Sequence, residues 1–402
     1  MSTNTTKPLG SFERMKSMNR STVLNTIRLH APLSRADIAK STQLTPPTVG
    51  NLVKELLAER FVRETNIGPS SGGRKPTMLE LDPTYHCCIG LDISSTTIKG
   101  VLCTLLGDCL HTAKQPLPSN CTTEELLQTA YTVTDLLLEK KQVDQKLHGI
   151  GIAMHGLVDV EQGISLFAPN LGLHNIQIRE RFQIRYDTNV MIDNDARAMA
   201  LGESWFGQGK TADSSVLINI GRGVGAGIVL QQRLQYGADD VSGEIGHMVI
   251  SEDGPLCSCG QRGCLQAYIS GPAIASIAES QLDDNASSPL RSQKKPLTGL
   301  DVYTAYQKGD ALAEAVFVQA GKRLGIALVN IIHTLNPSLI ILGGGVSLAG
   351  NILLPPAIDI VKRRGLTQKA KETTIVLSTL KEKAASIGAV TLLLESLFQE
   401  RF

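Results

Sequence analysis

The sequence predicts an α/β protein in which a small helical domain precedes a larger body of two similar lobes. Three observations support this prediction. The first 80 residues contain three short amphipathic stretches and then two alternating segments around a glycine-rich tip. Residues 86–103 and 215–230 share one plan: an apolar strand, a turn of small residues and a returning strand. At 402 residues, the chain is also too long for one ordinary hydrophobic core.

The composition is that of an ordinary soluble protein, with 42% hydrophobic and 19% charged residues. The longest apolar stretch, residues 324–346, is interrupted by Asn330, His333, Asn336 and Pro337, so we expect no membrane span. No signal peptide is evident, and five of the cysteines lie in apolar or loop contexts without framework spacing, which favours a reducing cytoplasm. These five are Cys87, Cys88, Cys103, Cys109 and Cys121.

Charge is unevenly distributed along the chain. Residues 1–80 hold twelve Lys and Arg against six Asp and Glu, whereas the whole chain has a net charge of +1. A basic first segment on a mildly acidic body indicates a polyanionic partner for that segment alone, although a solvated basic surface would have the same composition.

The basic segment has the pattern of a helix-turn-helix. Apolar spacing predicts a first helix over residues 18–30. Ser34, with Asp37 three positions later, is a natural cap for a second helix that ends near residues 43–44. Thr45 caps a third helix with Pro46 in its first position. The face of this third helix away from its apolar stripe carries short polar and basic groups that can reach base edges or phosphates. The candidate DNA contacts of the three helices are Arg35, Thr45, Thr48, Asn51 and Lys54.

Residues 61–64 and 78–81 alternate around the stretch 68–76, which predicts a wing hairpin. Its cationic tip contains Arg74 and Lys75 and is slim enough to enter a minor groove. A flexible linker is the alternative, and the adjacent helix-turn-helix favours the wing.

In the body, each strand–turn–strand unit is followed by further helix and strand signals. These cover residues 126–140 and 150–153 in the first half, and 311–335 and 339–343 in the second. The duplication predicts two α/β lobes around a cleft. Glycine-rich turns at strand ends would let backbone amides approach phosphate or sugar.

Between the lobes, a strand over residues 190–193 ends in Asn194 and Asp195 and opens a helix. The amide and carboxylate could hold sugar hydroxyls, and the carboxylate could act as a general base on a hydroxyl. The alternative is that Asp193 or Asn194 simply caps the helix.

A short stretch further on brings together one imidazole and three thiols, the soft donors that a tetrahedral zinc ion needs. Gly260 and Gly263 would let the backbone turn tightly enough for the sulfurs to converge. The alternative, a set of buried free thiols, is disfavoured by this clustering. Four protein ligands leave zinc no open position, so the ion would be structural. The candidate ligands are His247, Cys257, Cys259 and Cys264.

These motifs resemble the ROK family of sugar kinases and sugar-responsive repressors. The resemblance is carried by residues 244–247 with 257–264, by 194–196 and by 343–346, and it spans the chain from about Tyr85 to the end. The preceding helix-turn-helix resembles the repressor branch, in particular the xylose repressors of Gram-positive bacteria, through residues 32–35 and 72–76.

The resemblance implies an actin-like, hexokinase-like pair of lobes behind a winged helix-turn-helix domain. The implied domains are residues 1–82, a first lobe over 83–200 joined by the C-terminal helix 385–402, and a second lobe over 201–384 with the metal site. It also implies a structural Zn²⁺ that holds the sugar-site loop. The implied sugar contacts are Asn170, Asn194, Asp195, Glu244, His247 and Gln266.

Three positions depart from the family pattern. Gln266 stands where Glu is usual, which changes the hydrogen bonds available to the sugar. His155 replaces a usual Pro, and Leu173 replaces a usual Trp.

Two further departures favour a repressor over a kinase. The first phosphate loop has Ser94 and Ser95 where ROK kinases have two glycines, so β-carbons and hydroxyls occupy the space that ATP needs. The second loop has Arg222 in place of a usual Thr. Asp195, which resembles the catalytic base of the kinases, is retained and could instead bind a sugar hydroxyl.

The sequence therefore predicts a cytoplasmic, sugar-responsive DNA-binding repressor with a catalytically inactive kinase-like domain. Its partners would be double-stranded operator DNA and a small sugar effector, xylose or another aldose, in a homodimer or a dimer of dimers. An active ROK sugar kinase is the main alternative, and a DNA-binding architectural protein that senses no sugar is the third.

Overall fold

The computed structural model describes residues 11–67, 76–118, 120–284 and 287–399. It confirms the predicted α/β fold with a helical N-terminal domain. That domain contains α1 (Ser11–His30), β1 (Leu33–Ser34), α2 (Arg35–Thr42), α3 (Pro46–Ala58), β2 (Val62–Ile67) and β3 (Thr77–Leu81). The three strands form one sheet in the order β1-β3-β2. The predicted wing tip, with Arg74 and Lys75, lies outside the described residues.

The predicted caps form in this domain. Ser34 and Asp37 make a complete capping box at α2, and the Thr45 side chain accepts the N–H of Thr48 at α3. Helix α1, however, begins at Ser11 instead of residue 18. The added turns have no apolar stripe, but Lys16 lies 2.8 Å from Glu55 of α3, so part of their support comes from tertiary contacts.

The first lobe is built on a five-stranded sheet in the order β11-β7-β4-β5-β6. Its strands are β4 (His86–Ile93), β5 (Thr97–Thr104), β6 (Cys109–Pro116), β7 (Lys146–Met154) and β11 (Asn189–Asn194). Helices α4 (Thr123–Leu138) and α5 (Ile178–Tyr186) contribute to the core on one face. A small sheet of β8 (Leu157–Asp159), β9 (Ile164–Ala168) and β10 (Leu173–Ile176) adjoins it.

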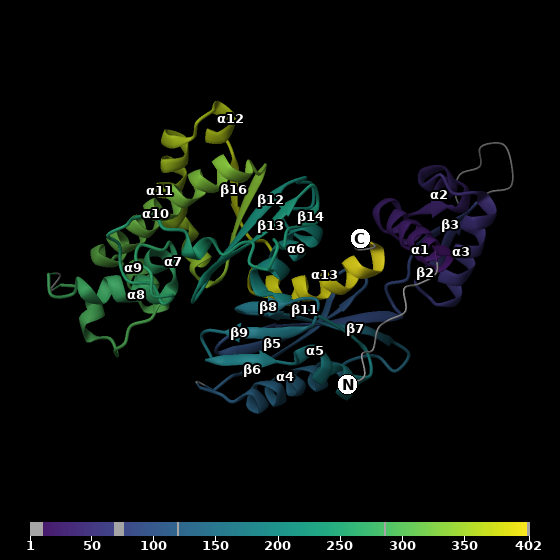
Figure 1. Ribbon diagram of the computed structural model, residues 1–402, viewed down its shortest axis with the longest axis horizontal. Coiled ribbons are helices and arrows are strands. Elements are labelled where there is room, and N and C mark those ends of the chain that lie inside the picture. Colours follow the sequence, from purple (N-terminus) through teal and green to yellow (C-terminus); the bar gives the residue numbers. More distant parts are fainter. Residues whose placement is uncertain (1–10, 68–75, 119, 285–286, 400–402) are drawn as a thin grey trace.

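The other face of this sheet is covered by the C-terminal helix α13 (Ala384–Phe398), drawn in yellow across the middle of Figure 1. A β-carbon on Gly90 would lie 2.0 Å from the carbonyl oxygen of Ser386, and one on Gly151 would lie 1.8 Å from that of Ala389. Because these positions are glycine, the helix backbone lies directly on the strands.

The second lobe has a five-stranded sheet in the order β14-β13-β12-β15-β16. Its strands are β12 (Ser215–Ile220), β13 (Val224–Leu230), β14 (Arg233–Leu234), β15 (Leu339–Gly343) and β16 (Thr374–Leu377). Its helices are α7 (Gln266–Ile269), α8 (Gly271–Ser280), α9 (Gly299–Gln307), α10 (Ala311–Leu335), α11 (Gly350–Arg364) and α12 (Gln368–Lys371). The strand–turn–strand units predicted for both lobes are thus present.

Helix α10 is long and apolar enough to cross a membrane, by length and composition alone. Of its most apolar window, 61% is buried, and the helix packs along α11 in the core of the second lobe. Its hydrophobicity is therefore explained by that core.

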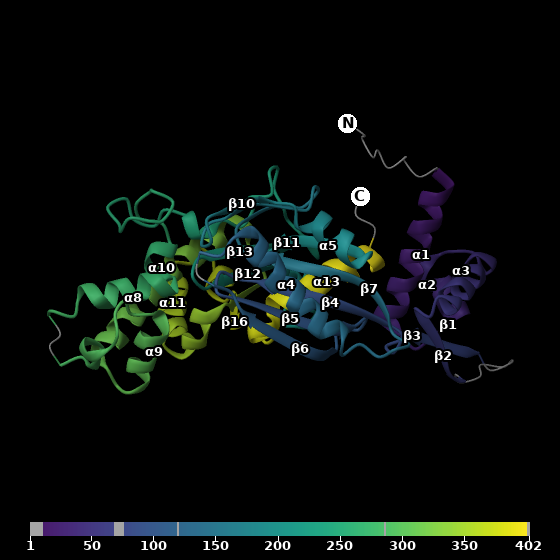
Figure 2. The ribbon, with the colours of Figure 1, turned by 90° about the horizontal axis from the view of Figure 1, so that it is seen from below.

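Helix α6 (Asp195–Phe206) connects the two lobes. It contacts α13 on the first lobe and β12 and β13 of the second. Figure 2 shows the elongated arrangement, with the N-terminal domain at one end and the second lobe at the other.

The N-terminal domain shares a hydrophobic core with the first lobe. The Phe61 ring stacks on His86 with centroids 4.0 Å apart, and His86 Nε2 lies 2.9 Å from the carbonyl oxygen of Glu59. One continuous cluster contains Leu24 of α1 together with Phe398 of α13. We call this junction between α1, the first lobe and α13 the domain joint.

Candidate functional site

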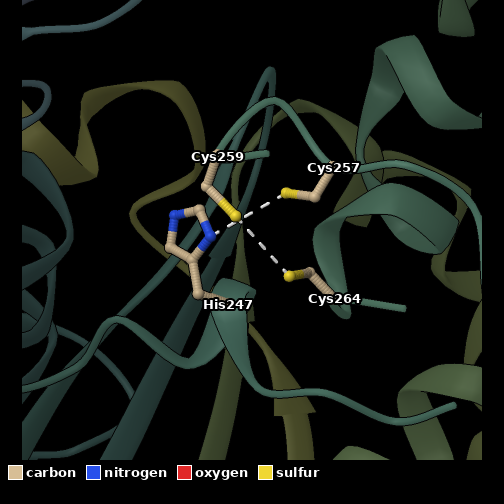
Figure 3. A group of neighbouring side chains, drawn as sticks. All are labelled: His247, Cys257, Cys259 and Cys264. Atoms are coloured by element: carbon tan, nitrogen blue, oxygen red, sulfur yellow. Dashed lines mark hydrogen bonds between the residues drawn. The ribbon is translucent and has the colours of Figure 1, made fainter. Parts of the chain in front are cut away.

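The His and Cys side chains predicted as metal ligands converge. Their ligand atoms all lie within 4.8 Å of one another, with 3.8 Å between Cys257 Sγ and His247 Nδ1 and 3.7 Å between the sulfurs of Cys259 and Cys264 (Figure 3). Two thiolates bound to a tetrahedral zinc at about 2.3 Å would be about 3.8 Å apart. The donor set and its spacing therefore fit zinc.

Local backbone geometry produces this convergence. Gly260 and Gly263 have φ angles of +87° and +72°, as their predicted role in tight turns requires. A β-carbon on Gly263 would lie 1.6 Å from the carbonyl oxygen of Ser251, so the turn has no space for a side chain. The Cys257 N–H donates to Gln261 O at 2.8 Å and closes the loop. We call residues 247–264 the knuckle.

Gln266 lies just after the knuckle. Its Nε2 donates to Cys257 Sγ at 3.1 Å and to Ser258 Oγ at 3.0 Å. A β-carbon on Gly223, in the second glycine turn, would lie 3.6 Å from Gln266 Oε1. The role of Gln266 as a sugar contact stays a prediction, and the structure gives its amide a different partner, a metal-ligand sulfur.

Glu244 links the knuckle to the acidic residues between the lobes. Its Oε2 lies 4.0 Å from Nε2 of His247. Burial raises the pKa of Glu244, the charge of His247 opposes that rise, and Asp195 adds to it. Glu244, His247 and Asp195 are therefore within electrostatic reach of one another.

Asp195 is the first residue of α6. Its Oδ1 accepts the N–H of Ala196 at 2.9 Å, and its Oδ2 accepts from Asn219 Nδ2 at 3.1 Å. Burial raises the pKa of Asp195, while a charge on His155 would lower it. Nε2 of His155 is buried and has no hydrogen-bond partner among the described residues.

Asn194 caps helix α6, as the alternative interpretation of this residue predicts. Its Oδ1 accepts the N–H groups of Ala196 and Arg197, which makes it the N-cap of α6. Its Nδ2 donates to Gly156 O at 2.9 Å. The remaining amide hydrogen is the part of this side chain left for a ligand.

Asn170 lies exposed in the turn between β9 and β10. That turn adjoins Gly156, whose carbonyl oxygen accepts from Asn194. A β-carbon on Gly156 would lie 2.1 Å from Phe167 O and 2.8 Å from Pro169 Cδ. The structure thus brings the Asn170 turn toward Asn194, and it places Asn194, Asp195, Glu244 and His247 on adjoining segments.

The sequence interpretation missed Asp92 as part of this group. Burial, and then the neighbouring Asp195, raise the pKa of Asp92 to about 7, against the charge of Lys99. Asp92 lies near the end of strand β4, opposite Lys99 of β5. In the sequence, Asp92 stands at the start of the first phosphate loop, and this position is the signal that could have identified it.

Arg197 was also missed. It is buried, donates to Asp193 Oδ1 at 2.6 Å, and donates to the carbonyl oxygen of Asp240 at 2.5 Å. The Asp240 carboxylate accepts from Val160 N at 3.4 Å. Arg197 thereby ties the loop that precedes Glu244 to the start of α6.

In the first phosphate loop, the Ser94 hydroxyl donates to Thr97 O at 2.8 Å and the Ser94 N–H donates to the same oxygen at 3.1 Å. Ser95 is 8% exposed. Hydroxyl and β-carbon atoms therefore fill and brace this turn. Arg222, in the second loop, is exposed.

On the N-terminal domain, Asn51 and Lys54 lie exposed on α3. Thr45 and Thr48 share a hydrogen bond of 2.8 Å at the start of that helix. Arg35 is paired with Glu64 of β2 at 2.9 Å, so its guanidinium already has an anionic partner.

The fold and site define a two-lobed α/β protein of sugar-kinase-like architecture, preceded by a small helical domain whose α2 and α3 fit a DNA-binding domain. A family model described as the ROK family matches residues 88–396 and leaves the helix-turn-helix outside. The chain belongs to the ROK family.

Both transcriptional regulators and sugar kinases are similar to this chain. A putative xylose repressor of Caldicellulosiruptor sp. is 30% identical over 97% of this chain and 98% of its own length. A glucokinase of Halalkalibacterium halodurans is 34% identical, but over 75% of this chain and 92% of its own. The crystal structure of a ROK family transcriptional regulator, a homologue of the E. coli MLC protein, has a TM-score of 0.85 at 28% identity and covers 96% of this chain and 98% of its own. The match to full-length regulators includes the N-terminal domain.

Proposed function

We propose that this protein is a sugar-responsive transcriptional repressor of carbohydrate-utilisation genes. The observation that supports it most is the shared hydrophobic core of the helix-turn-helix domain and the first lobe. A DNA-binding domain that was merely tethered would move independently of the body. In this proposal, a change in the body would be transmitted by direct packing.

The sugar would bind between the lobes. Asp195, Glu244 and His247 offer acceptors and a donor for hydroxyls, and Asn194 and Asn170 offer amides. Gln266 and the unpartnered Nε2 of His155 are further candidates. We propose xylose or another aldose as the effector, since the similar repressor reported above is named a putative xylose repressor.

Helix α6 supplies a route from sugar to DNA. Asp195 is at its first turn, and Trp205 is at its last, where the guanidinium of Arg28 from α1 lies over the indole. A sugar that pulls Asp195 would shift α6 against α1. The coupling free energy between sugar and operator binding can be no larger than the difference in sugar affinity between the two arrangements of α6 and α1.

In this proposal the knuckle holds one Zn²⁺ through His247, Cys257, Cys259 and Cys264. With four protein ligands, the ion supplies structure and no open coordination position. Its role is to hold His247 beside Glu244.

The kinase-like domain would not transfer phosphate, because Ser94 and Ser95 brace the first phosphate loop with side-chain atoms. The observation that favours the alternative, an active sugar kinase, is the retained Asp195 together with the glucokinase similarity. A coupled assay with ATP across hexoses and pentoses discriminates the two, since turnover above background establishes the kinase.

The DNA contacts would be Arg35, Thr45, Thr48, Asn51, Lys54, Arg74 and Lys75, in a cytoplasmic homodimer or dimer of dimers on a two-fold symmetric operator. The test is operator binding by the zinc-loaded protein with and without a panel of sugars. We expect one aldose to change operator affinity and to raise the thermal unfolding temperature. Indifference to every sugar, with operator binding intact, would instead indicate the DNA-binding architectural protein.

A further inference from the structure

Three cysteines lie in a row across neighbouring strands of the first lobe. Cys88 of β4 is paired with Cys103 of β5, and Cys103 is paired with Cys109 of β6. Opposed residues of antiparallel strands point to the same face of a sheet. That face is the one covered by α13, because Cys88 and Cys103 belong to the core cluster of the domain joint and Cys109 packs against it.

The row runs from the interior to an edge of the sheet. Cys88 and Cys103 are 0% exposed, whereas Cys109 is half-buried on the edge strand β6. A small molecule arriving from solvent therefore reaches Cys109 first.

The surroundings of Cys109 stabilise a thiolate. The neighbouring Cys103 side chain lowers the pKa of Cys109 to about 6 against the effect of burial, and Lys383 lowers it further. As a thiol, Cys109 donates to His111 O at 3.6 Å. Lys383 Nζ lies 3.9 Å from that sulfur. The neighbouring Cys109 and then burial raise the pKa of Cys103. The outer sulfur is therefore the nucleophile, and the inner one keeps its proton.

The pair also has the placement that a disulfide needs. Directly opposed residues in antiparallel strands have Cα atoms about 4.5–5.5 Å apart. Disulfides join Cα atoms about 4.4–6.8 Å apart. Cys103 and Cys109 are paired beside the loop of the β5–β6 hairpin, next to a register shift of the ladder between Leu102 and Cys103.

We propose that Cys109 and Cys103 form a peroxide-reactive dithiol site whose oxidation acts on the domain joint. The Cys109 thiolate attacks one oxygen of hydrogen peroxide, and the O–O bond breaks to leave a sulfenic acid and hydroxide, which takes up a proton. The Cys103 sulfur then attacks the Cys109 sulfur, and the displaced hydroxyl leaves as water with the Cys103 proton. Two thiols lose two electrons, and one peroxide becomes two waters.

The hairpin between the two cysteines reaches the DNA-binding domain. Leu105 and Leu106 line a cavity of about 360 Å³ whose other walls include Arg28 and Trp205. A β-carbon on Gly107 would lie 2.4 Å from the Phe206 ring, so the hairpin tip is already in tight contact with the end of α6. A disulfide between Cys103 and Cys109 would therefore constrain the loop that lies against α6 and faces Arg28 of α1.

The chemical step is tested on the reduced, zinc-loaded full chain treated with hydrogen peroxide, followed by non-reducing peptide mass spectrometry. We expect a peptide linking Cys103 to Cys109. Cys103→Ser should stop at a sulfenic acid that dimedone traps on Cys109, and Cys109→Ser should form neither product. Cys121→Ser is the matched control and should react as the wild type does. Each substitution is conservative, and thermal unfolding checks that each variant folds.

Oxidation confined to the knuckle cysteines, with release of zinc, would overturn the proposal. So would a rate of alkylation at Cys109 of the wild-type chain no faster than at Cys121. These two readouts need no DNA and are independent of the proposed repressor function.

The effect on the domain joint rests on that function. Oxidised wild-type protein should bind operator with an affinity several-fold different from that of the reduced protein, and a dithiol reductant should reverse the change. Cys103→Ser should show no such difference. A disulfide that forms without changing operator affinity would overturn the link to the joint, whereas failure of reduced protein to bind any operator would count against the repressor function itself.

Discussion

Arg28 of α1 lies with its guanidinium carbon 4.0 Å from the ring centre of Trp205 at the end of α6, and 5.4 Å from that of Phe398. Burial lowers the pKa of Arg28 to about 10, so this cation is held partly out of water by aromatic faces. The contact joins the DNA-binding domain to the helix that starts at Asp195.

Arg28→Met should weaken the coupling between sugar and DNA. Methionine keeps most of the apolar stem but removes the charge over the indole. We expect sugar affinity to be unchanged and the effect of sugar on operator affinity to fall by roughly 0.5–2 kcal/mol. Trp205 is the single tryptophan of the chain, so its fluorescence reports the joint directly. Ile184→Ala, at a 76% exposed position, is the control; full coupling in Arg28→Met would rule out this contact as the route.

Asp92→Asn should stabilise the protein at alkaline pH. The folded pKa of Asp92 is raised from 3.8 to about 7, so its contribution to stability is fully present below pH 3.8 and is lost as pH rises through 7. Replacing the buried carboxylate removes that loss, on the order of a few kcal/mol. Thermal unfolding should show a larger gain at pH 8 than at pH 5. Asp213→Asn, at an exposed position, should show none; equal gains at both pH values would contradict the assignment.

Gln266→Ala should reduce metal affinity. Its Nε2 donates to the Cys257 sulfur, and removing such an outer hydrogen bond typically costs about 10–100-fold in affinity. Competition with a chromophoric chelator measures the change. Gln261→Ala, an exposed side chain in the same knuckle, should bind metal as the wild type does. If sugar affinity falls while metal affinity holds, Gln266 is a sugar contact and the outer hydrogen bond is unimportant.

Asp195→Asn should weaken sugar binding. The substitution keeps the shape and the oxygen that accepts the Ala196 N–H, but it removes the charge and the oxygen that accepts from Asn219 Nδ2. A hydrogen bond to a charged group contributes about 1.5–3 kcal/mol, so we expect the sugar Kd to rise roughly ten- to hundredfold. Calorimetry on zinc-loaded protein measures it, with Asp213→Asn as control. An unchanged Kd would place the sugar elsewhere.

Lys54→Ala should weaken operator binding similarly for all sequences and reduce the salt dependence by about one counterion. Lys54 is exposed on α3 and is the one cationic side chain of that helix, which makes it the candidate there for a phosphate contact. Fluorescence anisotropy over a salt series measures the slope. Lys308→Ala, an exposed lysine of the second lobe, should leave it unchanged.

Much of this molecule was predictable because the relevant information is local. The helix caps at Ser34 and Thr45 follow from side chains that bond to backbone three residues away. The knuckle follows in the same way, since its four ligands lie within one short stretch whose glycines turn the chain.

Other features were beyond the sequence. Helix α1 begins earlier than its apolar pattern predicts, and its added turns have the tertiary contact between Lys16 and Glu55 of α3. The pKa of Asp92 depends on burial and on Asp195, which lies far away in the sequence at the start of α6.

By itself, the sequence determined the parts: a helix-turn-helix, two strand–turn–strand lobes, a knuckle of soft ligands and an acidic turn before α6. Only the tertiary structure decided their relations. It put Arg28 on Trp205, turned the Gln266 amide to Cys257, and aligned Cys103 with Cys109 beneath α13. The reason is physical: short-range spacing limits which groups can converge locally, whereas contacts between distant segments depend on how whole helices and sheets pack.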